Sequence, residues 1–155
     1  MDINFLEKIP NDFDTLVIFL FDGKSIGKKN ISKDLESKIQ ICLKNKDFNK
    51  DNFYELFSYN EGGVVKKIHV YKVKNFENLS DYSNFSGSKF LGLETKKNSL
   101  ISVISEDCVG FKFGHNEIIA ELAFGFHLKN YSFRKYKTLH KKTMKSVSKI
   151  NFYDK

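Results

Sequence analysis

The chain has 155 residues, 41% of them hydrophobic and 29% charged, and its formal net charge is +7. These values predict one globular domain over residues 1–155 and exclude a disordered chain. Two cysteines are too few for a disulfide framework, and no apolar run approaches the roughly 18 residues of a membrane span. The first residues lack the basic and apolar regions of a signal peptide, so we expect a cytoplasmic protein without a membrane partner.

The first predicted elements are a strand and a helix. Residues 15–21 form a continuous run of β-branched, aliphatic and aromatic side chains, which indicates a strand buried on both faces at the centre of a sheet. A helix is expected from Ser32, a suitable N-cap, to about residue 45. Its apolar stripe includes Cys42, which we interpret as a small buried hydrophobic side chain.

A hairpin and a second helix are expected next. Residues 53–59 and 64–73 read as strands, and Gly62 and Gly63 between them give the clearest turn signal in the chain. Residues 78–97 have helical spacing, with an expected break near Ser86-Gly87-Ser88.

The last third of the chain predicts a strand at 100–105, a helix that begins near Asn116, and a final strand within 144–153 at an edge of the sheet. Strands and helices thus alternate along most of the chain. This order predicts an α/β fold in which a mixed β-sheet lies between helices in three layers.

The segment at 125–138 carries the most specific pattern, G-x-x-L-x-x-Y-x-F-x-x-Y-K-T. It resembles the end of the N-terminal domain of the leucyl aminopeptidases, also called cytosol aminopeptidases. The matching residues, which we interpret as structural, are Gly125, Leu128, Tyr131, Phe133, Tyr136, Lys137 and Thr138. The pattern follows the apolar stripe of the last helix, so we expect that helix to end here and the chain to cross the surface.

The resemblance implies a macro-domain-like, non-catalytic domain that packs against a C-terminal catalytic domain of the same polypeptide. The parent protein would be a cytoplasmic hexamer that removes N-terminal amino acids from peptides. Two divalent metal ions, zinc or manganese, would bind in the catalytic domain, so no cofactor and no catalytic residue is expected in this chain. One departure is Tyr71-Lys72-Val73, which stands where the family tends to have a Gly-Leu-Gly turn.

The side chains capable of catalysis are scattered along the sequence. The N-T-D-A-E-G-R run of the family's catalytic domain is absent, and no histidine has a second ligand at metal-binding spacing. Glu117 and Glu121 share a predicted helix face, which is typical of a solvated surface. Cys108 could act as a nucleophile only if the fold brings a histidine to it.

Two other functions are compatible with the sequence. Residues 129–149 contain eight basic side chains and no acid, interleaved with aromatic rings, which is the general composition of a nucleic-acid-binding surface. The expected contacts are Lys129, Arg134, Lys135, Lys137, Lys141 and Lys142. The macro-like fold would also allow an ADP-ribose-type ligand, although the missing glycine turn argues against it.

The rings of Tyr131, Phe133 and Tyr136 are expected to pack back onto the domain, between the final helix and the sheet. Three neighbouring exposed rings would otherwise form an apolar patch on the surface.

Overall fold

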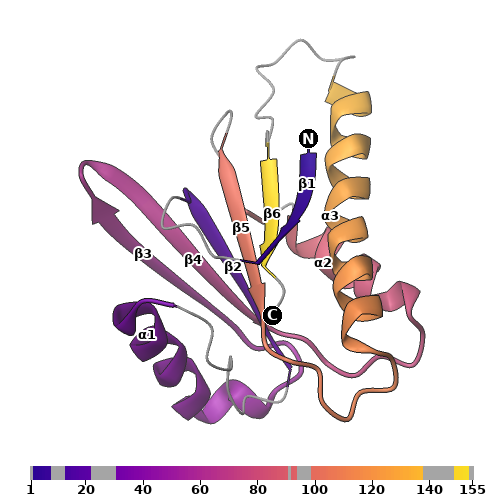
Figure 1. The fold of residues 1–155 in the computed structure, drawn as a ribbon, viewed down its shortest axis with the longest axis horizontal. Coiled ribbons are helices and arrows are strands. Elements are labelled where there is room, and N and C mark those ends of the chain that lie inside the picture. Colours follow the sequence, from indigo (N-terminus) through magenta and orange to yellow (C-terminus); the bar gives the residue numbers. More distant parts are fainter. Residues whose placement is uncertain are drawn as a thin grey trace.

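The computed structural model describes residues 2–7, 13–21, 31–90, 92–93, 99–137 and 149–153, with the side chains of 132–137 excepted (Figure 1). The elements, in chain order, are β1 Asp2–Leu6, β2 Thr15–Leu20, α1 Lys33–Lys44, the 3₁₀ helix η1 Lys46–Asn49, β3 Tyr54–Glu61, β4 Val64–Lys72, α2 Ser80–Phe90, β5 Leu100–Ser105, α3 His115–Lys137 and β6 Lys149–Tyr153. Within these residues no helix has the length and apolar character needed to cross a membrane.

The described strands form one mixed sheet of six strands in the order β1-β6-β5-β2-β4-β3. Neighbouring strands are parallel except β3, which pairs antiparallel with β4 at one edge. The β3–β4 turn contains Gly62 and Gly63 at φ 58° and 81°, a left-handed conformation that favours glycine. The predicted hairpin is therefore confirmed, and so is the α/β class with a mixed sheet.

Strand β2 lies inside the sheet and is buried along its whole length. Its side chains alternate between the two faces, as the pleat of a strand requires. Leu16, Ile18 and Leu20 belong to the core under α1, whereas Val17 and Phe19 belong to the core under α2 and α3. Helices thus cover both faces of the sheet (Figure 1), which explains why this strand is apolar on both sides.

Helix α1 begins where the sequence predicts. The Ser32 side chain accepts a hydrogen bond from the Leu35 N–H at 3.2 Å, which satisfies one of the free amides of the first turn. Leu35, Ile39 and Cys42 then face the sheet. Cys42 is only 1% exposed, so its interpretation as a buried hydrophobic side chain is confirmed.

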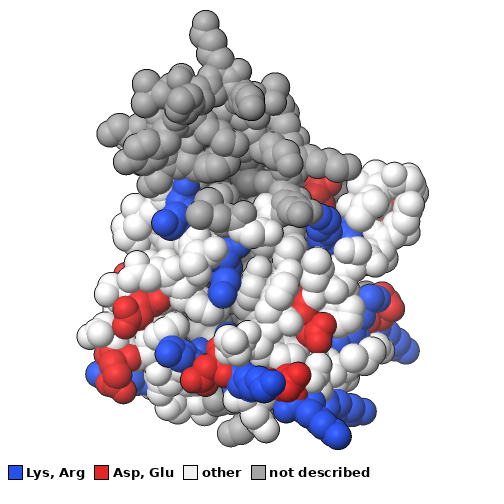
Figure 2. Space-filling view, turned by 180° about the vertical axis from the view of Figure 1, so that it is seen from behind, with Lys and Arg blue, Asp and Glu red and all other residues white. Residues whose placement is uncertain are grey.

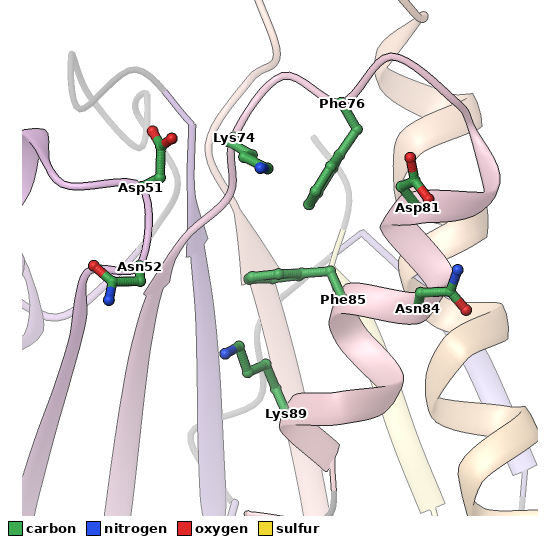
Figure 3. Close-up of a pocket in the computed structure, with 8 residues that line it drawn as sticks. All are labelled: Asp51, Asn52, Lys74, Phe76, Asp81, Asn84, Phe85 and Lys89. Atoms are coloured by element: carbon green, nitrogen blue, oxygen red, sulfur yellow. The ribbon is translucent and has the colours of Figure 1, made fainter.

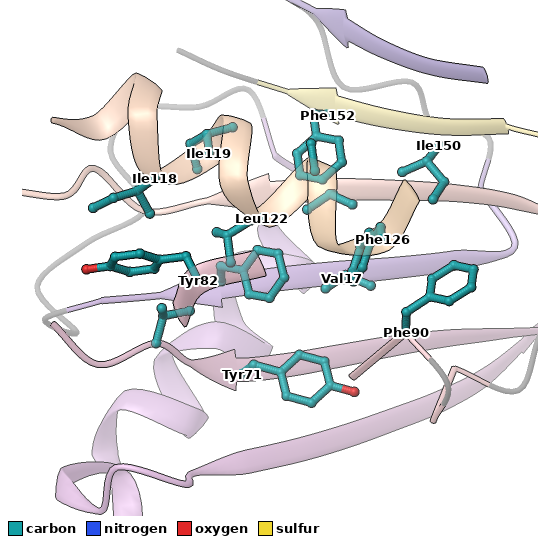
Figure 4. Close-up of a cluster of buried hydrophobic side chains, with 14 of the residues drawn as sticks. Val17, Tyr71, Tyr82, Phe90, Ile118, Ile119, Leu122, Phe126, Ile150 and Phe152 are labelled. Atoms are coloured by element: carbon teal, nitrogen blue, oxygen red, sulfur yellow. The ribbon is translucent and has the colours of Figure 1, made fainter. Parts of the chain in front are cut away.

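The larger core lies between the sheet and helices α2 and α3. Tyr82 of α2 and Ile118, Leu122 and Phe126 of α3 are fully buried there (Figure 4). The Phe126 ring centre lies 6.1 Å from that of Phe19. Further ring contacts join Phe126 to Phe90 of α2 at 5.4 Å and to Phe152 of β6 at 6.1 Å. Aromatic rings therefore connect α2, α3 and two strands in one cluster.

Two features of the sheet differ from the prediction. Strand β1, which was not predicted, pairs with β6, so β6 is internal and the expected edge position is wrong. Strand β1 is only partly buried, with Phe5 55% and Leu6 40% exposed, so its sequence lacks a clear buried face. The first part of the predicted last strand, 144–148, lies outside the described residues.

The expected break in the second helix is also wrong. Helix α2 continues through Gly87, and an added Cβ there would lie 3.0 Å from Lys129 Cγ and 3.1 Å from the Gly125 carbonyl oxygen of α3. The glycine therefore permits close contact between two helices rather than a turn. Residues 94–97 of the predicted helix lie outside the described residues.

Candidate functional site

Gly125, the first residue of the leucyl aminopeptidase-like pattern, lies inside α3 and not at its end. The helix continues to Lys137, which corrects the expectation that the chain leaves the helix here. A Cβ added at Gly125 would lie 2.1 Å from the Ser83 carbonyl oxygen and 2.1 Å from Ser86 Oγ. Ser86 is fully buried, so α2 and α3 contact each other through small residues. Gly125 therefore allows α3 to approach α2 closely.

Leu128 and Tyr131 of the pattern face outward, next to Phe124, which precedes the pattern. Phe124, Leu128 and Tyr131 are 48%, 43% and 63% exposed, and their spacing of four and three residues aligns them along α3. We call these three residues the exposed stripe. The prediction that Tyr131 packs onto the domain is wrong. Because the helix continues, the inward positions of this turn are taken by Phe126 and then by the buried Asn130.

The other predicted positions are only partly described. Lys129 is exposed, and its stem runs beside Gly87 of α2. The backbone of α3 includes Phe133, Arg134, Lys135, Tyr136 and Lys137, but their side chains lie outside the description. Thr138, Lys141 and Lys142 lie outside the described residues altogether. The expected nucleic-acid contacts thus remain predictions apart from the exposure of Lys129.

Described charges of both signs are intermixed on the face shown in Figure 2. Blue and red side chains alternate across its lower part, and white surface lies between them. No large patch of one sign is visible there among the described residues. On this face the described charges therefore supply no separate basic surface for a phosphate backbone.

A pocket of about 470 Å³ opens beyond the carboxyl end of β4, between the η1–β3 turn and α2 (Figure 3). Its aromatic wall is formed by Phe76 and Phe85, whose ring centres lie 6.0 Å apart. Lys74 Nζ lies 5.2 Å from the Phe76 ring centre, and Lys89 Nζ lies 5.2 Å from that of Phe85. Asp51 contributes a carboxylate on the opposite side.

This pocket was not predicted because its residues come from three segments that are separate in the sequence. The lining also includes Asp81, so its two ammonium groups are matched by two carboxylates, and the aromatic wall is the feature that suits a ligand with a ring. The ADP-ribose-type ligand stays a prediction, and calorimetry with ADP-ribose is its direct test.

A buried carboxylate joins the ends of β2 and β5. Glu106 is 2% exposed, and its Oε2 accepts a hydrogen bond from the Phe21 N–H at 2.7 Å. The Glu106 N–H in turn donates to the Phe19 carbonyl oxygen at 2.9 Å. The carboxyl ends of two parallel strands are thereby held together, at the side of the sheet where α/β proteins usually bind ligands.

Cys108 follows Glu106 by two residues, and the fold places a histidine next to it. The Cys108 Sγ lies 3.4 Å from Nδ1 of His115, the first residue of α3, and the Cys108 N–H donates to the same nitrogen at 3.3 Å. The sequence indicates that Cys108 could act as a nucleophile if a histidine lies next to it, but it does not indicate which of the four histidines this is. The structure supplies the partner, seven residues further along the chain.

Cys42 provides a contrast within the same protein. Burial, with a smaller contribution from the negative charge of Glu55, raises the pKa of the Cys42 thiol to about 11. A thiol with that pKa is almost entirely protonated at neutral pH and reacts slowly.

The described residues contain no group of three or more His, Cys, Asp or Glu side chains that could hold a metal ion. Glu117 instead accepts a hydrogen bond from the Gly114 N–H at 2.8 Å, at the start of α3. This contact stabilises a helix N-terminus, which is the structural role expected of an acid there.

No protein-family model matches the chain, and a search of curated proteins gives no match. The function is therefore proposed from the residues of this chain and their geometry.

Proposed function

We propose that this chain is the N-terminal, non-catalytic domain of a leucyl aminopeptidase-like metallopeptidase, with a structural role in its assembly. The observation that carries the proposal is the division of one sequence pattern between two sides of α3. Gly125 packs against α2, whereas Leu128 and Tyr131 extend outward beside Phe124. The inward side holds this domain together, and the outward side is available to a second domain.

The fold supports this proposal at the level of layout. A mixed sheet with a single antiparallel edge strand, covered by helices on both faces, agrees with the macro-domain-like arrangement that the resemblance implies. Fold alone does not assign a function, so the pattern in α3 is the main support for the proposal.

The exposed stripe is the surface that the second domain would cover. Three large apolar side chains aligned on one helix form a patch of the kind that marks interaction sites on protein surfaces. We assign it to the C-terminal catalytic domain of the same polypeptide, because the resemblance places such a domain after this one. The parent would form a hexamer and bind two zinc or manganese ions in that catalytic domain.

Two measurements test this function. The purified chain, supplied with zinc or manganese, should release no product from a leucyl amide; turnover at roughly 1–1000 per second would refute a non-catalytic role. The reading frame downstream of the Lys155 codon should encode a domain with a cluster of metal-binding carboxylates. A stop codon directly after Lys155 would exclude the proposed catalytic domain in the same polypeptide.

One observation favours a second function, nucleic-acid binding. Tyr131 lies in the basic segment and is 63% exposed, so its ring is accessible for stacking on a base. Fluorescence anisotropy with a labelled single strand should then show binding that weakens with salt, with a slope of about −0.7 per phosphate contact. Tyr131→Ala should reduce the affinity. Absence of binding at low salt, or binding indifferent to salt, would exclude this function.

A further inference from the structure

The pair formed by Cys108 and His115 has the geometry of a nucleophile next to a base. A distance of 3.4 Å from Sγ to Nδ1 permits a hydrogen bond between the thiol and the imidazole. The two residues flank a loop whose ends are fixed by secondary structure, because Cys108 follows β5 and His115 begins α3. Glu106, buried at the end of β5 and bonded to β2, holds the cysteine side of this loop in place.

The hydrogen bond from the Cys108 N–H shows how the imidazole is oriented. Nδ1 accepts this bond at 3.3 Å, so this nitrogen faces Cys108. The Cys108 Sγ lies 3.4 Å from the same nitrogen, which can take the thiol proton once the Cys108 N–H bond is released. His115 is thus oriented as a proton acceptor for Cys108 when the sulfur attacks an electrophile.

The second cysteine lies on the other side of the sheet. Cys42 belongs to the core under α1, whereas Cys108 packs at the margin of the core under α2 and α3. Since the chain contains only these two cysteines, no other thiol of the chain stands next to Cys108. A mixed disulfide formed at Cys108 would therefore persist and would not be resolved into an internal disulfide.

We infer that Cys108 and His115 form a nucleophilic thiol site that undergoes exchange with low-molecular-weight disulfides, which makes Cys108 a site of S-thiolation. The Cys108 thiol transfers its proton to His115 Nδ1, and the thiolate attacks one sulfur of the disulfide. The S–S bond of the reagent breaks, and its second sulfur leaves as a thiolate with the electron pair. Cys108 is oxidised and the leaving sulfur is reduced. This site is independent of the proposed domain function.

The test is the rate at which the intact chain reacts with 5,5′-dithiobis(2-nitrobenzoate) at pH 7.5, followed by the absorbance of the released thiolate. Mass mapping of peptides identifies the modified cysteine. A synthetic peptide of residues 104–112 is the reference, because it contains Cys108 without His115 and without the fold. Cys108 in the folded chain should react faster than the same cysteine in the peptide, and Cys42 should stay unmodified.

The matched variants are His115→Asn and His127→Asn. Asparagine at 115 can still accept the Cys108 N–H bond but cannot take a proton, whereas His127 is an exposed histidine elsewhere on α3. His115→Asn should slow the Cys108 reaction by about tenfold or more, since general bases contribute roughly 10²–10⁴-fold. His127→Asn should leave the rate unchanged.

Equal rates for the unsubstituted chain and a folded His115→Asn variant would overturn the inference. A rate in the intact chain no higher than that of the peptide would also overturn it. If circular dichroism shows that His115→Asn does not fold, the test rests on the Cys108 reaction rates of the intact chain and the peptide. A rate in the chain no higher than in the peptide then overturns the inference.

Discussion

Replacement of Gly125 by alanine should destabilise the domain, although alanine is the better helix former. At an exposed helical position this change would stabilise the protein by about 0.4–1 kcal/mol. Here the new Cβ would lie 2.1 Å from the Ser83 carbonyl oxygen and 2.1 Å from Ser86 Oγ. The hydroxyl can rotate away, but the carbonyl belongs to the backbone of α2, so the two helices must separate.

The expected magnitude follows from these opposing effects. Overpacking of a well-packed contact typically costs about 1–3 kcal/mol and at times more. The contact belongs to the larger core, where the ring centres of Phe90 in α2 and Phe126 in α3 lie 5.4 Å apart, so separation of the helices disturbs buried rings too. We expect a net loss of about 1–3 kcal/mol in the free energy of unfolding. At this chain length each kcal/mol lowers Tm by about 2–4 °C.

Urea denaturation followed by circular dichroism measures the effect, and two other glycines serve as controls. Gly92→Ala should be nearly neutral, because its Cβ would only approach the Lys89 carbonyl oxygen at 3.4 Å, an ordinary contact. Gly87→Ala should fall between the two, because its Cβ would lie 3.0 Å from the flexible Lys129 side chain and 3.1 Å from the Gly125 carbonyl oxygen, a tight contact but a milder one than 2.1 Å. Ser86→Ala combined with Gly125→Ala should not restore stability, since the clash with the backbone of Ser83 remains. If Gly125→Ala proved neutral or stabilising, the close contact between α2 and α3 would be refuted.

Three further predictions concern exposure and burial. Tyr131→Ala should change the unfolding free energy of the isolated chain by no more than about 0.5 kcal/mol, since the ring is 63% exposed; a loss of several kcal/mol in urea denaturation would contradict the exposed stripe. Glu106→Ala should cost roughly 1–3 kcal/mol in the same assay, because the Phe21 N–H loses its buried acceptor, and an unchanged midpoint would contradict this. Burial raises the pKa of the phenols of Tyr71 and Tyr82 above the ordinary value of about 10, so the unfolded state loses these protons first. The contribution of these two phenols to the free energy of unfolding should therefore be fully present below pH of about 10 and fall as the pH rises above it. Alkaline unfolding monitored by tyrosine absorbance checks this sign.

The local elements could be predicted where short segments contain the whole physical signal. A continuous apolar run specified β2, Ser32 specified the start of α1, and two consecutive glycines specified the β3–β4 turn. The cap and the turn depend on residues a few positions apart. The buried strand depends only on apolar side chains entering the core, whichever residues they meet there. The α/β class followed from the order of these elements, because alternating strands and helices pack as layers.

The tertiary structure decided what depends on contacts between distant segments. Gly87 and Gly125 look like helix breakers in the sequence, yet each permits a helix to approach its neighbour. Strand β1 has little apolar alternation of its own, and it is ordered by backbone pairing with β6 from the other end of the chain. Sequence spacing could not select His115 as the partner of Cys108, because the turn between β5 and α3 determines their distance. Sequence spacing also could not place Tyr131 outward. The ring faces outward because α3 continues past Gly125, and the helical turn then sets the direction of residue 131.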